Sequence, residues 1–164
     1  MAVTYEPIAT TTLGANAADI TFSSISSAYT DLILVVNAGQ VTADNFYAIQ
    51  VGNGSIDTGS NYSDTALNGN GSTASSYRNT SSTRALVAGS NDSAVKDNII
   101  VHFQNYSNTT TNKTILSRCN ITAYRVVATV SLWRSTSAIN TIKIYGGANL
   151  LSGSTATLYG VKAA

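Results

Sequence analysis

The chain of 164 residues contains one cysteine and one proline, and only 10% of its residues are charged. The single cysteine, Cys119, allows no internal disulfide, and its neighbours do not have the spacing of a zinc site. Because soluble domains usually have about 25% charged residues, this surface gives unusually little electrostatic repulsion between subunits that pack closely. The length suggests one domain that can bury a core without disulfides or metal.

The sequence also lacks a long hydrophobic run and a basic cluster. The longest apolar run, 32–36, is too short to span a bilayer, and the start shows neither the basic nor the apolar region of a secretory signal. The net charge is +1, and the basic residues are spread from Arg78 to Lys162 without the stripe that nucleic-acid binding requires. We therefore expect neither a membrane nor a nucleic acid as a partner.

The chain is rich in Ser, Thr and Asn, which make up 59 of its 164 residues, and in short runs where apolar and polar residues alternate. Such period-two runs, bounded by Ser, Gly and Asn clusters, are typical of strands in an antiparallel sheet. We expect about eight strands, at 19–22, 31–37, 45–51, 97–104, 113–117, 124–134, 139–145 and 155–161. Residues 52–95 alternate less regularly, and three further candidate strands lie there, at 62–67, 75–77 and 84–87.

Turn signals recur at a spacing of about 8–12 residues with no helical segments between the strands, which predicts an all-β sandwich or barrel. About eight strands with long mid-chain excursions fit an antiparallel β-sandwich of jelly-roll type better than an up-and-down barrel. The competitor, an immunoglobulin-type sandwich, is usually smaller and has a Cys-Trp-Cys core. We expect the jelly-roll domain to span residues 18–164, after an extended N-terminal arm at 1–17.

The alternation also predicts which side chains face outward. In 97–104 the odd-numbered side chains are the more apolar, and in 124–134 the even-numbered ones are. We expect these apolar series to face the core. The opposite series then supply four outward candidates for a subunit interface: Ile100, His102, Val127 and Trp133.

Residues 31–37 differ from the other strands because both of their faces are apolar. A strand of this kind is covered on both sides. In a sandwich the second cover is either a neighbouring subunit or a packed loop.

We find no residue set that predicts catalysis, a cofactor or a metal. The one histidine, His102, lies mid-strand on an outward face, and the many serines make a Ser-His-Asp set unrecognisable by residue type. Each Asp fits a turn or a strand start, and no carboxylate pair of the glycosidase kind stands out. Asp57 and Asp64 are the nearest approach to a calcium site. We expect a protein that is not an enzyme.

Several distinctive segments lie along nearly the whole chain: Ile8-Ala-Thr-Thr-Thr-Leu-Gly14, 20–25, 29–32, Gly59-Ser-Asn-Tyr-Ser63, 104–110, Leu132-Trp-Arg-Ser-Thr-Ser-Ala-Ile139 and 153–164. As a set they resemble a family of small structural proteins of tailed bacteriophages, especially phages of cyanobacteria and aquatic bacteria. The resemblance implies a jelly-roll virion protein that commonly forms trimers, either a capsid decoration (cement) protein or part of a tail fibre. In place of the family's Asn-Gly-Asp loop this chain has Gly52-Asn-Gly-Ser55.

From this we expect a decoration protein on the outer capsid surface of a virion, because the chain is a single domain of low charge without a shaft-forming repeat. Its expected partners are the major capsid protein and further copies of itself in a homotrimer. The N-terminal arm is expected to contact the capsid through Val3, Tyr5, Pro7 and Ile8.

The alternative is a tail-fibre or receptor-binding module that recognises a host surface glycan. Loops at 52–83 and 104–112, rich in Tyr, Asn and Ser, favour it because these residue types build adaptable binding surfaces. A polysaccharide-degrading enzyme is a third hypothesis, which the missing carboxylate pair argues against.

Overall fold

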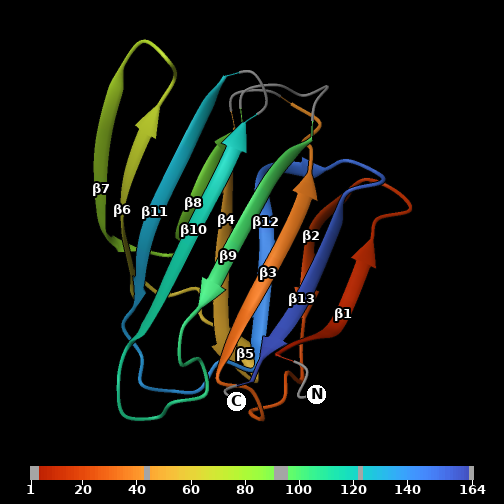
Figure 1. Ribbon diagram of the computed structural model, residues 1–164, viewed down its shortest axis with the longest axis vertical. Helices are drawn as coiled ribbons and strands as arrows, with labels where there is room; N and C mark the ends of the chain where they lie inside the picture. The colour runs from red at the N-terminus through yellow and green to blue at the C-terminus, as the bar shows by residue number, and fades with distance from the viewer. Residues whose placement is uncertain (1–3, 43–44, 91–95, 122–123, 163–164) are drawn as a thin grey trace.

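The protein is a sandwich of two stacked β-sheets, shown in Figure 1. The computed structural model describes residues 4–42, 45–90, 96–121 and 124–162. Within these ranges it has thirteen β-strands and no helix, and all strand pairs are antiparallel. No helix able to cross a membrane occurs in the described ranges.

The larger sheet has eight strands and the smaller has five. The larger consists of β1 (Tyr5–Thr12), β3 (Asp31–Ala38), β6 (Tyr62–Gly69), β7 (Ala74–Ser82), β9 (Asp97–Phe103), β10 (Lys113–Ile121), β11 (Arg125–Trp133) and β13 (Thr155–Val161), in the spatial order β1-β13-β3-β9-β10-β11-β6-β7. The smaller consists of β2 (Ala17–Phe22), β4 (Asn45–Asn53), β5 (Ser55–Ile56), β8 (Ala85–Ser90) and β12 (Thr141–Leu150), in the order β2-β12-β4-β5 with β8 also paired to β4.

The chain winds repeatedly between the two layers, because β1 and β3 lie in the larger sheet while β2 and β4 lie in the smaller. This winding is how a jelly roll is built, and the predicted antiparallel β-sandwich is confirmed. The expected number of about eight strands is too low. β1 is mostly exposed and Thr-rich and β5 has two residues, so neither gives a period-two hydrophobic signal.

The core lies between the sheets and is formed by alternate side chains of facing strands. The larger sheet supplies, among others, Leu32, Leu34, Val36, Ile99, Val101, Phe103 and Leu158, and the smaller supplies Ile49, Val51, Ile142 and Ile144, all fully buried. Burying each such side chain contributes roughly 1.5–3 kcal/mol. In β9 the buried side chains are Ile99, Val101 and Phe103, which are the odd-numbered residues that the sequence predicts to face the core.

β11 alternates as predicted, but its faces are reversed. Val127 and Trp133 are each 3% exposed and belong to the core, whereas Val126 and Val130 are 62% and 46% exposed. The prediction that Val127 and Trp133 face outward was wrong because it assigned the more apolar series of this strand to the core. In the structure the inward series includes the polar Thr129, which is buried, and apolar side chains remain on the surface.

The expected arm at 1–17, separate from a domain at 18–164, is also corrected. Residues 5–12 form β1, which pairs with β13 from Tyr5–Val161 to Thr12–Thr155 and makes one edge of the larger sheet. A Thr-rich segment pairs through its backbone without needing an apolar face. Its Pro7 lies beside a shift in register, where proline is tolerated in an edge strand.

A single carboxylate joins the loop after β5 to the core. Asp57 Oδ2 accepts hydrogen bonds from Trp133 Nε1 at 2.7 Å and Asn61 Nδ2 at 2.9 Å, and Asp57 Oδ1 accepts one from the Gly59 N–H at 2.8 Å. Partial burial acts to raise the pKa of Asp57, but these hydrogen bonds together hold it below its ordinary value of 3.8. The ionised carboxylate therefore stabilises this loop.

The reversed faces of β11 can be tested with neighbouring valines. Val127→Thr should lower the free energy of unfolding by about 1–3 kcal/mol, because a hydroxyl enters the core. Val126→Thr should change it by less than about 0.5 kcal/mol, as is usual for surface substitutions. Urea unfolding followed by the fluorescence of Trp133, the one tryptophan, measures both, and equal effects would contradict the assignment.

The role of the Asp57 carboxylate predicts a pH-dependent difference between the protein and its Asp57→Asn variant. At pH 7 the variant should be less stable by about 1–3 kcal/mol, because the charged acceptor of three hydrogen bonds is lost. A pKa lowered by folding gives stability that is present above the unfolded-state pKa and disappears as pH falls through the folded-state pKa.

The difference should therefore stay constant from neutral pH down to about pH 5 and close below about pH 4. Urea unfolding at a series of pH values measures it. A difference that is unchanged in strong acid would show that the charge of Asp57 is not what matters.

Candidate functional site

The outer face of the larger sheet, on the side away from the smaller sheet, has a broad apolar surface. Six large aliphatic side chains there are between 37% and 65% exposed: Val35, Leu67, Ile100, Leu116, Val126 and Val130. They come from the neighbouring strands β3, β9, β10, β11 and β6. We call these six side chains the apolar face. Contiguous exposed apolar patches usually mark interaction sites.

The pairing register arranges this surface in rows across the strands. One row runs Leu67, Ala128, Arg118, Ile100 and Val35. The next runs Thr65, Val130, Leu116, His102 and Ile33. Since strands lie about 4.8 Å apart, five strands span about 19 Å, and rows two residues apart are separated by about 6.7 Å.

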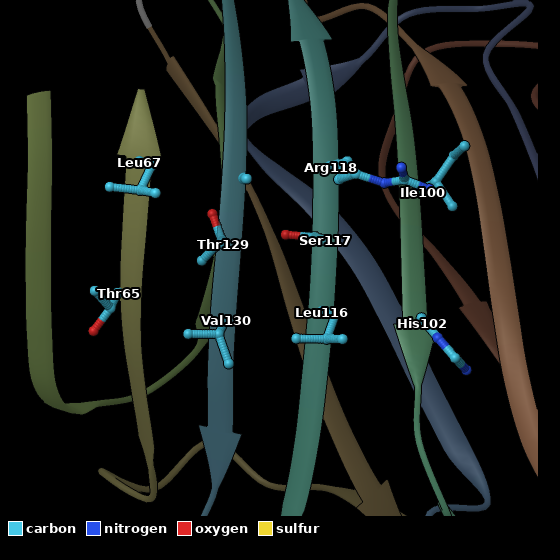
Figure 2. Close-up of a pocket in the computed structure, with 10 residues that line it drawn as sticks. Thr65, Leu67, Ile100, His102, Leu116, Ser117, Arg118, Thr129 and Val130 are labelled. Carbon is cyan, nitrogen blue, oxygen red and sulfur yellow. The ribbon is translucent and has the colours of Figure 1, made fainter. Parts of the chain in front are cut away.

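Two adjoining hollows lie along the apolar face. Their volumes are about 590 and 770 Å³, and both are lined by Leu67, Ile100, Arg118 and Ala128. Figure 2 shows Leu67, Val130, Leu116 and Ile100 on four neighbouring strands, with the Arg118 side chain extending from β10 toward Ile100. The exposed large side chains of the lining are thus aliphatic, with the guanidinium of Arg118 among them, while Ser117 and Thr129, which are buried, line the first hollow between these rows.

Arg118 has no carboxylate partner among the described residues. The ion pairs in this part of the chain are His102–Asp31 and Lys162–Glu6. Arg118 is exposed, so its charge is solvated as long as nothing covers the face.

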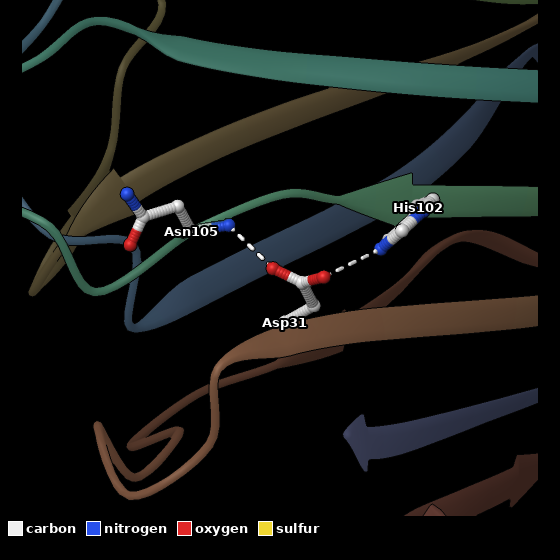
Figure 3. A network of polar contacts seen from close by, with 3 residues as sticks. All are labelled: Asp31, His102 and Asn105. Atoms are coloured by element: carbon white, nitrogen blue, oxygen red, sulfur yellow. Dashed lines mark hydrogen bonds and ion pairs between the residues drawn. The ribbon is translucent and has the colours of Figure 1, made fainter. Parts of the chain in front are cut away.

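His102, which lines the first hollow, belongs to a polar network that Figure 3 shows. His102 Nε2 lies 3.1 Å from Asp31 Oδ2, and Asp31 Oδ1 accepts a hydrogen bond from the Asn105 N–H at 2.7 Å. Asn105 has a φ of 48°, in the left-handed region that Asn tolerates better than most residues. Asp31 therefore fixes both the turn after β9 and the position of His102.

Of the four predicted interface residues, the structure brings two together on the outer face. Ile100 and His102 both line the first hollow, whereas Val127 and Trp133 are in the core. Val127, although 3% exposed, also lines the second hollow. Among the exposed large side chains of the lining, sequence reasoning missed five: Leu67, Leu116, Arg118, Val126 and Val130.

One feature of the sequence did indicate this surface, namely that residues 31–37 are apolar on both faces of their strand. Its inward side chains are fully buried, but Val35 on the opposite face is 41% exposed. The described chain does not supply the second cover that this strand predicts.

The predicted capsid-contact residues lie along the β1 edge. Tyr5 and Pro7 are exposed, and Ile8 is half-buried against the core. Val3 lies outside the described residues. Their contact with a capsid stays a prediction.

The two aspartates considered for calcium have separate partners. Asp64 is buried, which raises its pKa, and it accepts a hydrogen bond from Asn79 Nδ2 at 2.7 Å, whereas Asp57 holds Trp133. No group of three or more His, Cys, Asp or Glu side chains that could hold a metal occurs among the described residues.

The loops proposed for glycan binding use several tyrosines internally. Within 52–83, Tyr62 is fully buried and Tyr77 packs half-buried against the core. Within 104–112, Tyr106 is fully buried. These three rings stabilise the sandwich and do not present a flat aromatic surface to a sugar.

No protein-family model and no curated protein matches the sequence. Among solved structures, CG-16, a homodimeric agglutinin from chicken liver, is similar at 8% identity and a TM-score of 0.32, with 88% of this chain and 96% of that chain covered. A mutant of the alginate lyase Aly36B in complex with an alginate tetrasaccharide is similar at 10% identity and a TM-score of 0.34, with 94% and 80% covered. A protein of unknown function from Shewanella oneidensis MR-1 is similar at 12% identity and a TM-score of 0.26, with 98% and 71% covered. Similarity at this level carries no argument about what this chain binds.

Proposed function

We propose that this protein is a non-enzymatic structural protein of a bacteriophage virion, a decoration protein that binds the outer capsid surface through the apolar face of its larger sheet. The resemblance to phage structural proteins supports its place in a virion. The observation that carries the mode of action is the apolar face itself, with six exposed aliphatic side chains on five adjacent strands.

The chemistry of the apolar face supports binding to protein over binding to a glycan. Its exposed large side chains are Val, Leu and Ile, which gain free energy when another apolar surface removes them from water. Sites for polar ligands depend instead on precisely placed hydrogen-bonding groups. The weakly charged surface, with 10% charged residues, lets neighbouring copies approach without strong repulsion.

The size of the apolar face suits the centre of an interface. A patch of about 19 Å by 13 Å, from the strand and row spacings, covers about 250 Å², and a standard interface buries about 800 Å² on each partner. The surrounding Thr and Asn side chains form a polar rim of the usual kind. Because many copies bind one closed shell, modest contacts add up to resistance against internal pressure.

The major capsid protein is the proposed partner of this face, and the β1 edge, with exposed Tyr5 and Pro7, adds a second contact. Self-association into a homotrimer is part of the same proposal. Cross-linking of intact particles separates the alternatives, because a decoration protein links to the major capsid protein and a fibre module links to tail proteins.

Leu67→Asp should abolish binding to capsids that lack this protein. Burying a carboxylate against an apolar partner costs several kcal/mol, which corresponds to a loss in affinity of about 100-fold or more. Leu67 is 65% exposed, so the fold itself should tolerate the change. Co-sedimentation with purified, decoration-free heads measures binding.

Asn149→Asp on the smaller sheet is the matched control, since it adds the same charge at an exposed position away from the apolar face. It should bind like the unaltered protein. Full binding by the Leu67 variant would contradict the role of the face, and failure of the unaltered protein to bind heads would contradict the decoration function.

A further inference from the structure

We infer that the apolar face binds a segment of another virion protein that presents one Asp or Glu carboxylate between aliphatic side chains, and that Arg118 holds this carboxylate. The inference rests on the proposed function and specifies the chemistry of the partner surface. It starts from the position of Arg118, which lines both hollows and lies in the row between Ala128 and Ile100.

A guanidinium at the centre of an apolar surface needs a counter-charge once that surface is covered. While the face is open, water solvates Arg118. A purely apolar partner would remove this water and leave a buried, unpaired charge, which is strongly unfavourable. A carboxylate on the partner would pair this charge, because the planar guanidinium can bind both carboxylate oxygens with two parallel hydrogen bonds.

The face does not supply this carboxylate itself. Among the described acidic residues of the larger sheet, Asp31 shares the outer face, and its two oxygens already bond to His102 and the Asn105 N–H. A third hollow of about 260 Å³ adjoins the first at Thr65 and Val130, and its lining includes both Arg78 and the buried Asp64. Arg118 makes the first two hollows cationic as well as apolar, and their complement is acidic and apolar.

This charge pattern argues against a second copy that packs by the same face. A twofold axis through the hollows would bring the two Arg118 side chains toward each other, with no free described carboxylate on either face. Like charges opposed in a covered interface cost several kcal/mol.

The polar border supports a protein segment that docks in one orientation. Asn37, Asn98 and Asn120 form the next row across the strands, and Asn37 Nδ2 donates to Asn98 Oδ1 at 2.8 Å. An apolar centre with amides on one border and the Asp31–His102 pair on the other has the composition of a specific interface.

A free fatty acid has the same combination of carboxylate and aliphatic carbon, but the shape of the face does not favour it. The lining side chains Leu67 and Val126 are 65% and 62% exposed, so a single acyl chain lying there would keep one side in water. A protein surface covers the whole patch and excludes that water.

The first test compares Arg118→Met with Lys143→Met in binding to decoration-free heads. Methionine keeps the apolar stem and removes the charge. Arg118→Met should weaken binding by at least about tenfold and make it less sensitive to salt. Lys143→Met removes one charge from the smaller sheet and should bind like the unaltered protein.

If Arg118→Met binds as tightly as the unaltered protein while Leu67→Asp does not bind, the carboxylate contact is overturned and the decoration function stands. Tight, saturable binding of a fluorescent dodecanoic acid that is lost in Arg118→Met would instead identify a fatty acid as the occupant and also overturn the inference.

The second test uses assembled virions and needs no purified, decoration-free heads. Virions assembled with the Arg118→Lys variant are treated with a water-soluble carbodiimide, which joins an amine directly to a touching carboxylate as an amide with loss of water. Mass spectrometry should find position 118 linked to an Asp or Glu of another virion protein, flanked by aliphatic residues.

A link to a tail protein, together with failure to bind heads, would refute the decoration function and support the inferred contact. A link only to another copy of this chain, or no link at position 118, would overturn the inference.

Discussion

The packing of β3 and β9 against the smaller sheet is the constraint on which the rest of this structure depends. Their inward side chains, from Leu32 to Val36 and from Ile99 to Phe103, are fully buried. Once these side chains are fixed inward, strict alternation sends Val35, Ile100 and His102 outward. The in-register pairing through β10, β11 and β6 extends this alternation across the sheet. The burial of the inward side chains of β3 and β9 therefore determines which side chains form the outer face.

How far the sequence predicts this fold depends on the difference in polarity between the two series of each strand. In β9 the inward series is clearly the more apolar, and its prediction is confirmed. In β11 both series contain valines, and the core takes the one with Thr129 and Trp133. Local pattern could not decide this, because the orientation of β11 follows from its pairing with β10 and from the hydrogen bond between Trp133 and Asp57. β1 was missed as a strand for a related reason, since it is held by backbone pairing at an edge.

The candidate site was harder to predict than the fold, because its parts are distant in sequence. Leu67, Ile100, Arg118 and Ala128 become neighbours only through three successive strand pairings. One local signal did point to the site, namely the apolar residues on both faces of 31–37. It indicated that a second cover was needed, but it could not show that an arginine would lie at the centre of the surface to be covered.

The register shift beside Pro7 in β1 affects how copies of the protein meet at high concentration. An edge strand offers unpaired N–H and C=O groups to any other chain, and proline together with an irregular ladder makes such an edge a poor template for further pairing. Without these features, copies at high concentration would pair along these edges into continuous ribbons. The interrupted edge at β1 therefore favours separate folded units.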